Sequence, residues 1–391
     1  MRTFGVEEEL LLVDAASGRP VPVAGEVLSA DERAGRRGGG ALVAEMHQEM
    51  IEAITRPTAD VLELVREATA LRAAADSAAR SVGARAVALG TSPLPARPHP
   101  TASRRYNAMM SAYGALPRHS LECALHVHVG IESAEEGVAV LDRIRVWLPV
   151  LVALTANSPF HHGEDTGHAS WRTIAWNQWP NAGPLDVLGT VEAYRDLERR
   201  LVRSGVVMDA GMLYFAARLS RAHPTVEVRV ADVPLDVSVT ATIAALARAM
   251  VDTAAAEWRA GLPAPAAPTA LLRLASWQAA LCGVRGTLLD PETGESAPAE
   301  VVTGRLLEHV MGALEANGDD GTVVGGMGAI ATEGTGADIQ RRSLRSMSRL
   351  DEVVRMAAER TVAEHSLPIR PIRPTVESPL ERGEGPKVEQ R

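Results

Sequence analysis

Three consecutive glutamates stand inside an apolar segment near the start of the sequence, Phe4–Asp14 (FGVEEELLLVD). The segment reads as a β-strand, in which side chains alternate between two faces. Glu7 and Glu9 therefore share one face, and Glu8 points to the other. Two carboxylates about 7 Å apart repel each other unless an arginine or lysine, a shared proton or a divalent cation lies between them. Taken alone, the segment is equally compatible with a solvent-exposed edge strand.

Three later segments repeat this combination of strand-like sequence and ionisable side chains on one face. They are Met50–Thr55 with Glu52, Leu121–Ile131 with His126 and His128, and Thr225–Val230 with Glu227 and Arg229. The first of them can also be read as helix. If all four segments join one antiparallel sheet, one face packs under helices and the other is lined by glutamate, histidine and arginine.

Such a face predicts a metal site. Burying four carboxylates without cations is prohibitive. Oxygen ligands in this number suit Mg²⁺, and an imidazole among them also tolerates Mn²⁺. A magnesium cluster indicates phosphoryl transfer, in which metal ions neutralise phosphates and an arginine stabilises the transferring group.

Helix signals separate the four strands. Asp60 and Glu63 form a capping-box pattern, which opens a helix that ends at Gly83. A second capping box precedes a helix predicted over residues 134–154. Further helices are predicted over 102–113, 187–203, 238–259, 269–281, 300–317 and 339–364, and short strands over 85–90 and 213–219. The fold class predicted is α+β, with an antiparallel sheet and helices packed outside.

A long loop is predicted over residues 157–181. It holds three of the six tryptophans, Trp171, Trp176 and Trp179, together with Arg172. Loops of this length are usually functional or disordered, and the aromatic side chains argue against disorder. The tryptophans are expected either to form part of a site or to be hydrophobic core.

Three other segments are rich in Gly, Pro or charge. Residues 31–40 are expected to be mobile. The Gly-rich residues 317–336 are predicted to form a loop that closes over the site and excludes water. Residues 367–391 are expected to be a disordered tail, which leaves a single domain over residues 1–366.

The composition narrows the class of protein. With 46% hydrophobic and 23% charged residues, an ordinary globular chain is expected. The net charge of −9, without a basic block, argues against nucleic-acid binding. Cys123 and Cys282 form no CxxC pair, so a reducing compartment is expected. No secretion signal is recognised, and the longest apolar run, Val146–Ala156, is too short to span a bilayer. We expect a cytoplasmic protein without a membrane partner.

Seven short motifs occur in a fixed order along the chain. They are GVEEEL at 5–10, MIEAIT at 50–55, RYNAMM at 105–110, LHVHVG at 125–130, DTGHASWR at 165–172, VEVRVAD at 226–232 and GTGAD at 334–338. Together they resemble the glutamate–cysteine ligase type 2, or carboxylate–amine ligase, family of the glutamine-synthetase-like superfamily. P-loop, dinucleotide-binding, nucleophile-elbow and HExxH signatures do not occur. The resemblance implies an antiparallel sheet curved into a funnel, with helices outside and ATP at one end.

The resemblance also implies roles for individual residues. The metal ligands implied are Glu7, Glu9, Glu52, His126 and Glu227. Arg229 is implied to contact the γ-phosphate, and Arg172 to bind the acid substrate or the acyl phosphate. The candidates for binding nucleotide or substrate, each with a structural role as the alternative, are His128, Arg105, Tyr106 and Trp176. Glu8, on the opposite face, is expected to tolerate substitution better than Glu7 or Glu9.

The implied reaction is an ATP-dependent ligation with Mg²⁺, or Mn²⁺, as cofactor. The γ-carboxylate of glutamate attacks ATP, and an amine then displaces phosphate from the acyl phosphate to form an amide. Cysteine is the default amine, and a specialised biosynthetic amine is the first alternative. Asn177–Gln178 stands where a more basic pair is expected, which leaves the acid and the amine open. The general base is not identified.

Two alternatives belong to other classes of protein. One is a non-catalytic homologue that binds nucleotide or metal, and the other is a phosphotransferase of the guanidino-kinase kind. The presence of all four carboxylates disfavours the first. The expected partners are small-molecule substrates, and a homo-oligomer is compatible with the sequence.

Overall fold

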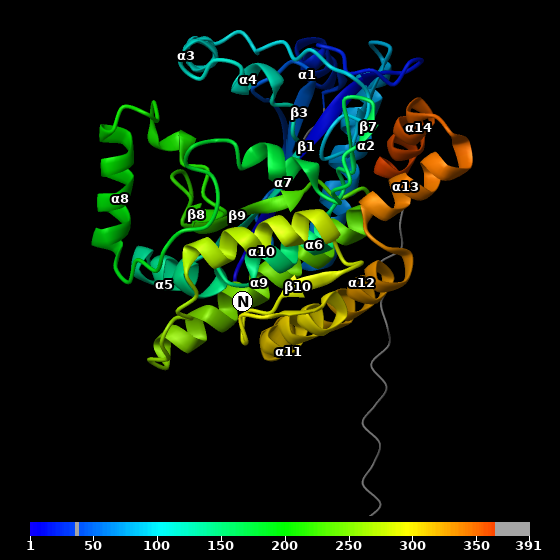
Figure 1. Ribbon diagram of the computed structural model, residues 1–391. Coiled ribbons are helices and arrows are strands. Elements are labelled where there is room, and N and C mark those ends of the chain that lie inside the picture. The colour runs from blue at the N-terminus through cyan, green and yellow to red at the C-terminus, as the bar shows by residue number, and fades with distance from the viewer. Residues whose placement is uncertain (36–38, 364–391) are drawn as a thin grey trace, which may run out of the picture.

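The computed structural model describes residues 1–35 and 39–363. At its centre lies a seven-stranded sheet, in which every pair of neighbouring strands is antiparallel (Figure 1). Its strands, in order, are β2 (Ala41–Ala44), β3 (Met50–Ile54), β1 (Phe4–Asp14), β5 (Ala124–Gly130), β9 (Thr225–Asp232) and β8 (Ala217–Leu219), while β4 (Ala84–Val87) also pairs with β1. The four strands predicted to carry the site are therefore neighbours, and the predicted α+β class is confirmed.

The register of the central strands places their ionisable side chains next to one another. Directly opposed residues of neighbouring antiparallel strands lie on the same face of a sheet. The opposed pairs are Glu7 with His126, Glu9 with Glu52, and His128 with Glu227. One polar face therefore extends over β3, β1, β5 and β9, as the strand alternation predicted.

The other face of the sheet packs on helices and forms the main hydrophobic core. Its principal helices are α2 (Val61–Arg80), α5 (Ala134–Ile144), α6 (Leu148–Thr155) and α9 (Val237–Arg259). Among the described residues, α9 is the one helix long and apolar enough to cross a membrane, but 78% of its most apolar window is buried inside the protein. That is the position of a core helix. The helix predicted over 134–154 is broken after Ile144, and α6 restarts with Pro149 in its first turn.

Glu8 is buried on this core side of β1. Its carboxylate accepts hydrogen bonds from Arg72 of α2 (Nε to Oε2, 2.8 Å; Nη2 to Oε1, 2.6 Å) and from Thr240 of α9 (2.6 Å). Glu8 is 1% exposed and Arg72 is 0% exposed. Glu8 does point away from Glu7 and Glu9, as predicted. The expectation that it tolerates substitution has no basis here, because removing it leaves the Arg72 charge buried without its carboxylate.

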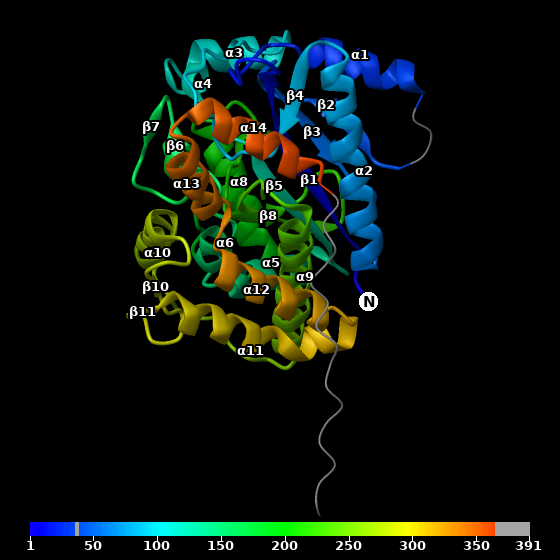
Figure 2. The same ribbon diagram turned by 90° about the vertical axis from the view of Figure 1, so that its right-hand side faces the viewer.

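Short helices and turns border the polar face. The predicted loop 157–181 is partly structured, since it contains β6 (Phe160–His161), β7 (Glu164–Asp165) and α7 (Trp171–Trp176). The other bordering elements are α3 (Arg104–Ala112), α4 (Leu116–His119), α8 (Val191–Arg203) and the 3₁₀ turn η1 (Ala210–Met212). In Figure 2 the N-terminus marks one end of β1, and α3 and α4 lie beyond its other end. The polar face thus has two distinct ends.

The C-terminal third is helical and lies on the core side. It contains α10 (Thr269–Cys282), β10 (Thr287–Leu289), β11 (Ser296–Pro298), α11 (Ala299–Asn317), α12 (Asp320–Glu333), α13 (Gly336–Met347) and α14 (Leu350–Thr361). The prediction of a lid over 317–336 is wrong, because α12 occupies most of this segment and packs against α9 (Figure 2). Its glycines permit that approach: a Cβ on Gly326 would lie 1.9 Å from Thr242 Oγ1.

Two further expectations concern less regular segments. Within 31–40, the residues up to Ala34 belong to helix α1 (Ala24–Ala34), and residues 36–38 lie outside the described part of the chain. The predicted disordered tail, 367–391, lies entirely outside it.

Candidate active site

A cavity of about 340 Å³ lies over the polar face of the sheet. Every residue predicted from sequence to form the site lines it, with the exception of Arg172. Those lining residues are Glu7, Glu9, Glu52, Arg105, Tyr106, His126, His128, Trp176, Glu227 and Arg229. Side chains from segments more than 200 residues apart in sequence are thus brought together by one sheet face and its border.

Carboxylate oxygens and imidazole nitrogens converge in three overlapping groups in this cavity. Within each group, one candidate ligand atom from every residue lies within 4.8 Å of the others. The groups are Glu9, Glu45 and Glu52; Glu7, Glu52 and His126; and Glu7, His128 and Glu227. This donor set, rich in hard carboxylate oxygens, fits Mg²⁺ or Mn²⁺ and does not resemble the thiolate-rich sets that favour zinc.

Glu45 belongs to the first group and was not predicted from the sequence. It follows β2 directly, at the start of the connection to β3. The β2–β3 hairpin folds it back beside Glu52, whose strand pairs with β2 through Val43. The only available signal was a second glutamate seven residues before Glu52, in a stretch that reads as either helix or strand.

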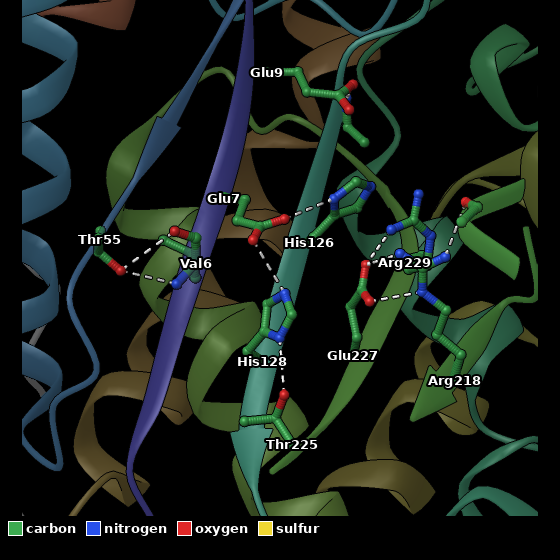
Figure 3. Close-up of polar contacts among 12 residues, drawn as sticks. Val6, Glu7, Glu9, Thr55, His126, His128, Arg218, Thr225, Glu227 and Arg229 are labelled. Atoms are coloured by element: carbon green, nitrogen blue, oxygen red, sulfur yellow. Dashed lines mark hydrogen bonds and ion pairs between the residues drawn. The ribbon is translucent and has the colours of Figure 1, made fainter. Parts of the chain in front are cut away.

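Glu7 is held between two imidazoles (Figure 3). His126 Nδ1 lies 3.3 Å from Glu7 Oε2, and His128 Nε2 lies 3.2 Å from Oε1. Burial by itself raises a carboxyl pKa, but the contacts with His126 and His128 bring the pKa of Glu7 below its usual range. Burial and the Arg229 charge lower the pKa of His126 to about 4. His126 is therefore neutral at pH 7, the form in which imidazole binds a metal.

The pKa values of Glu9 and Glu52 shift in the opposite direction from that of Glu7. Burial and the Glu45 charge raise the pKa of Glu9 to about 8. Burial and the Glu7 charge raise the pKa of Glu52 well above its usual value. One oxygen of Glu9 already accepts a hydrogen bond from the Ala124 amide (2.7 Å). A cluster that retains protons near neutral pH is one that a divalent cation would stabilise in its ionised form.

Glu227 is clamped by two arginines (Figure 3). Arg218 on β8 donates to both of its oxygens (2.7 and 3.1 Å), and Arg229 on β9 donates to Oε1. Despite burial, these two charges lower the pKa of Glu227 to about 2. The pairing of β9 with β5 slips by one residue around His126, a β-bulge. Glu227 and Arg229 stand at alternate positions of β9 and line the same cavity. Arg229 is 8% exposed, and its Nε has no hydrogen-bond partner among the described residues.

Arg172 lies behind β9, outside the lining of the main cavity. Its Nη2 donates to the Arg229 carbonyl (3.1 Å) and its Nη1 to the Val230 carbonyl (3.3 Å). Its guanidinium carbon is also 5.8 Å from the centroid of the Trp176 ring. The structure therefore places Arg172 where it supports the backbone that carries Arg229.

The end of the cavity near α3 is aromatic. Arg105 pairs with Asp209 (3.0 Å), and its guanidinium carbon lies 5.9 Å from the Tyr106 ring centroid. Trp176 packs against Tyr214, with ring centroids 4.7 Å apart. Further lining residues that the sequence did not reveal are Tyr214, Arg218, Arg221, Ser120 and Glu122. Single aromatic or charged residues in loops carry no spacing pattern from which to predict them.

A second cavity, of about 640 Å³, opens at the N-terminal end of β1. Its lining includes residues Thr3–Val6 and Gly130–Glu132, together with Arg2 and Arg259. Glu7, His128 and His223 line both cavities. The two spaces therefore meet at the carboxylate and imidazole that stand next to Glu227.

Sequence comparison finds relatives along almost the whole chain. The sequence model of the glutamate–cysteine ligase family 2 matches residues 3–364. A Paenarthrobacter aurescens protein with the provisional name glutamate–cysteine ligase 2-1 is 47% identical over 365 residues, which cover 92% of this chain and 95% of that protein. A Streptomyces coelicolor protein provisionally named glutamate–cysteine ligase 2 is 46% identical over 366 residues, covering 93% of this chain and 100% of that protein.

Two solved structures share the fold. Glutamate–cysteine ligase from Francisella tularensis, in complex with AMP, matches with a TM-score of 0.68 at 13% identity, covering 93% of this chain and 89% of that one. A bifunctional glutathione synthetase from Pasteurella multocida matches with a TM-score of 0.65 at 15% identity, covering 92% and 52%. The antiparallel sheet with helices outside that the resemblance predicts, and the prediction of an ATP-dependent ligase, are confirmed. The chain belongs to the glutamate–cysteine ligase family 2.

Proposed function

We propose that this protein uses ATP to activate the γ-carboxylate of glutamate and joins it to an amine, with cysteine as the default amine. The observation that carries the proposal is the face of β3, β1, β5 and β9, where three ligand groups and the Glu227–Arg229 pair line one cavity. The names of the relatives, which are glutamate–cysteine ligases, support the choice of substrates.

The residues present fit divalent cations. Five buried or half-buried carboxylates with raised or lowered pKa values lie around the neutral imidazole of His126, a donor set that suits Mg²⁺. Glu9, Glu45 and Glu52 would hold one cation, and Glu7, His126, His128 and Glu227 would hold others. Bound cations neutralise the phosphates of ATP and the charge that develops during phosphoryl transfer.

ATP is proposed to occupy the second cavity, with its phosphates at the junction between the two spaces. Arg2 and Arg259 line that cavity, and Glu7 and His128 form the junction. The AMP complex of the Francisella tularensis ligase supports nucleotide binding by this fold. The acid and the amine would then bind in the first cavity, on the side of Glu9 and the aromatic end.

The chain's own residues supply positioning and charge. Arg229 lines the cavity with a buried guanidinium whose Nε has no partner among the described residues, so it can donate to the γ-phosphate as negative charge moves onto the leaving and transferring groups. Glu227 and Arg218 fix the orientation of that guanidinium, and Arg172 holds the backbone beneath it.

The test is product analysis. Purified protein is incubated with ATP, Mg²⁺ and glutamate across a panel of amines that includes cysteine, and ADP, phosphate and amide products are measured, the last by mass spectrometry. A ligase releases ADP and phosphate in equal amounts with an amide. ADP and a phosphorylated acceptor without free phosphate would indicate a phosphotransferase instead. Binding of ATP without any turnover would indicate a non-catalytic homologue.

Two variants connect turnover to the site. Glu9→Gln and Arg229→Ala should each abolish amine-dependent ADP release, because the first removes a proposed ligand and the second the proposed phosphate contact. Glu308→Gln, an exposed carboxylate on α11 that lines neither cavity, is the matched control and should keep full activity. Full activity of either site variant would contradict the assignment.

The single domain over 1–366 and the cytoplasmic location remain predictions. The described residues form one sheet with its covering helices, which supports a single domain. The buried position of α9 supports a soluble protein.

A further inference from the structure

We propose that Glu122 binds the α-ammonium group of the amino-acid substrate and so selects amino acids over simple carboxylic acids. This inference rests on the proposed function, since it names a recognition residue of the same site. Glu122 lines the main cavity but belongs to none of the three ligand groups.

Glu122 is a buried carboxylate whose charge has no ion-pair partner in the described part of the chain. It is 8% exposed, and no arginine nitrogen of the described residues lies within 4 Å of its carboxylate. Ser120 and backbone amides donate hydrogen bonds to it. The positive charge that acts on the pKa of Glu122 is that of Arg172. The Arg172 guanidinium, however, donates its hydrogen bonds to the carbonyls of Arg229 and Val230. To stay ionised, a buried carboxylate in this state needs a cation from elsewhere.

The position of Glu122 along the sheet suits an amino-acid substrate. Glu122, Ala124 and His126 follow one another at alternate positions of the same extended segment, so they share the polar face. The Glu9 carboxylate contacts the Ala124 amide, and Glu122 stands two residues further along, about 7 Å in an extended chain. Glutamate carries its ammonium group three carbons from the γ-carboxyl carbon. One substrate molecule can therefore reach from the ligands around Glu9 to Glu122.

The direction of that reach also agrees with the placement of ATP. The second cavity opens beyond Glu7, on the N-terminal side of β1, whereas Glu122 lies beyond Glu9 on the opposite side. The γ-carboxylate would then lie between the phosphates and the ammonium anchor. Burial raises the pKa of Glu122 to about 7, which agrees with a carboxylate that is completed by a bound cation.

The chemistry of an ammonium group fits this pocket better than a metal does. An ammonium has three donors, and Glu122 offers acceptor oxygens without belonging to any group of three or more ligating side chains among the described residues. A site built around one such charged hydrogen bond rejects an analogue that lacks the donor, because the carboxylate is then left buried and unpaired.

The experiment compares glutamate with glutarate, which lacks only the amino group, in wild-type protein and Glu122→Gln. ADP release with Mg²⁺ and a saturating amine gives kcat/KM for both acids, and calorimetry with Mg²⁺ and ADP gives their affinities. We expect the wild-type preference for glutamate to fall by about 10- to 100-fold in the variant. The kcat/KM for glutarate and the KM for ATP should stay within about threefold. Glu308→Gln is the control and should leave the preference intact, and thermal melting checks that Glu122→Gln is folded.

Several outcomes would overturn the proposal. Equal loss of activity on both acids would mean a structural or proton-transfer role, and an unchanged preference would mean no contact with the ammonium group. Failure of the proposed function looks different, because the wild-type protein would then release no ADP with glutamate and any amine. In that case calorimetry with paired acids, such as aspartate and succinate, still decides: equal binding of amino and deamino forms, or no binding of either, excludes an ammonium site at Glu122.

Discussion

Substituting Glu7 and Glu8 separately by glutamine tests whether adjacent residues of β1 serve two different purposes. The two substitutions are chemically identical and one residue apart. Glu7 faces the cavity, with a side chain that is 22% exposed, whereas Glu8 faces the core and is 1% exposed. We expect Glu8→Gln to lower stability and to leave the activity of the folded protein intact. We expect Glu7→Gln to lower activity and to leave stability nearly unchanged.

The cost of Glu8→Gln follows from its partners. Arg72 and Thr240 together donate three hydrogen bonds to the Glu8 carboxylate, and the Arg72 guanidinium is fully buried. Removing one member of a buried ion pair typically costs about 3–5 kcal/mol. With an unfolding entropy of about 2.1 cal/mol/K per residue over roughly 360 folded residues, this corresponds to a fall in Tm of about 4–7 °C. A double-mutant cycle with Arg72→Met should give a coupling energy of about 1–3 kcal/mol.

Glu7→Gln should act on the chemistry instead. It removes one negative charge from a face where Glu7 raises the pKa of both Glu52 and Glu45, so the loss of its histidine contacts is partly offset and Tm should change by about 1–2 °C at most. It also removes a proposed ligand from two of the three groups. We expect kcat for ADP release to fall by at least about 10²-fold.

The assay measures Tm and the denaturant midpoint together with ADP release per folded molecule at a temperature well below both melting transitions. Normalising to folded protein separates a stability loss from a catalytic one. If Glu8→Gln lost as much activity per folded molecule as Glu7→Gln, with similar Tm values, the register of β1 would be refuted.

Three further predictions address the rest of the molecule. Arg229→Ala should lower kcat for ADP release per folded molecule by about 10²- to 10³-fold. It should also lower Tm, because Glu227 and the neighbouring carboxylates lose a buried positive charge, and an unchanged kcat would remove Arg229 from the phosphate site. Because burial and Glu45 raise the pKa of Glu9 to about 8, the metal-free folded state binds a proton that the unfolded state has lost above pH 4.5, so Tm in EDTA should fall as the pH rises from 5 to 8. Mg²⁺ should reverse most of that fall, and a Tm in EDTA that does not change with pH would contradict the assignment. Gly326→Ala should cost about 1–3 kcal/mol in unfolding free energy by pushing α12 from α9, without a change in kcat; a selective loss of kcat would instead support a lid role for this segment.

The sheet was predictable because its strands carry two signals at once. In β1 and β5, apolar residues on one face alternate with ionisable residues on the other, so the pattern indicates both the strand and the side that faces the site. That is why Glu7, His126 and Glu227 could be placed on one face without knowledge of the strand order. The order itself, β3-β1-β5-β9, depends on long-range pairing, which local sequence does not record.

The residues that sequence analysis missed lack such a pattern. Glu45 stands just outside a strand, so no alternation marks it, and only the β2–β3 hairpin brings it to Glu52. Arg172 was assigned to the acid substrate or the acyl phosphate from the family resemblance, but its hydrogen bonds to the Arg229 and Val230 carbonyls place it behind β9. The Gly-rich segment 317–336 was read as a loop from composition, whereas its glycines allow α12 to pack closely on α9. For Arg172 and α12 the deciding contacts are made by residues far away in sequence, whereas Glu45 depends on the hairpin that joins β2 to β3.

The ion pair behind β1 gives a physical reason for the arrangement as a whole. On the cavity side, Glu7, Glu9 and Glu52 raise one another's free energy whenever no cation is bound, and that repulsion acts on the strands that carry them. On the core side, Glu8 ties the same stretch of β1 to α2 through Arg72 and to α9 through Thr240. A hydrophobic side chain at position 8 would favour this register only through burial, since apolar contacts are non-directional. A bidentate pair with fixed geometry does specify it, and a one-residue slip would move every ligand on β1 to the wrong face. The buried charge opposite the site is therefore best understood as what keeps a self-repelling strand in place.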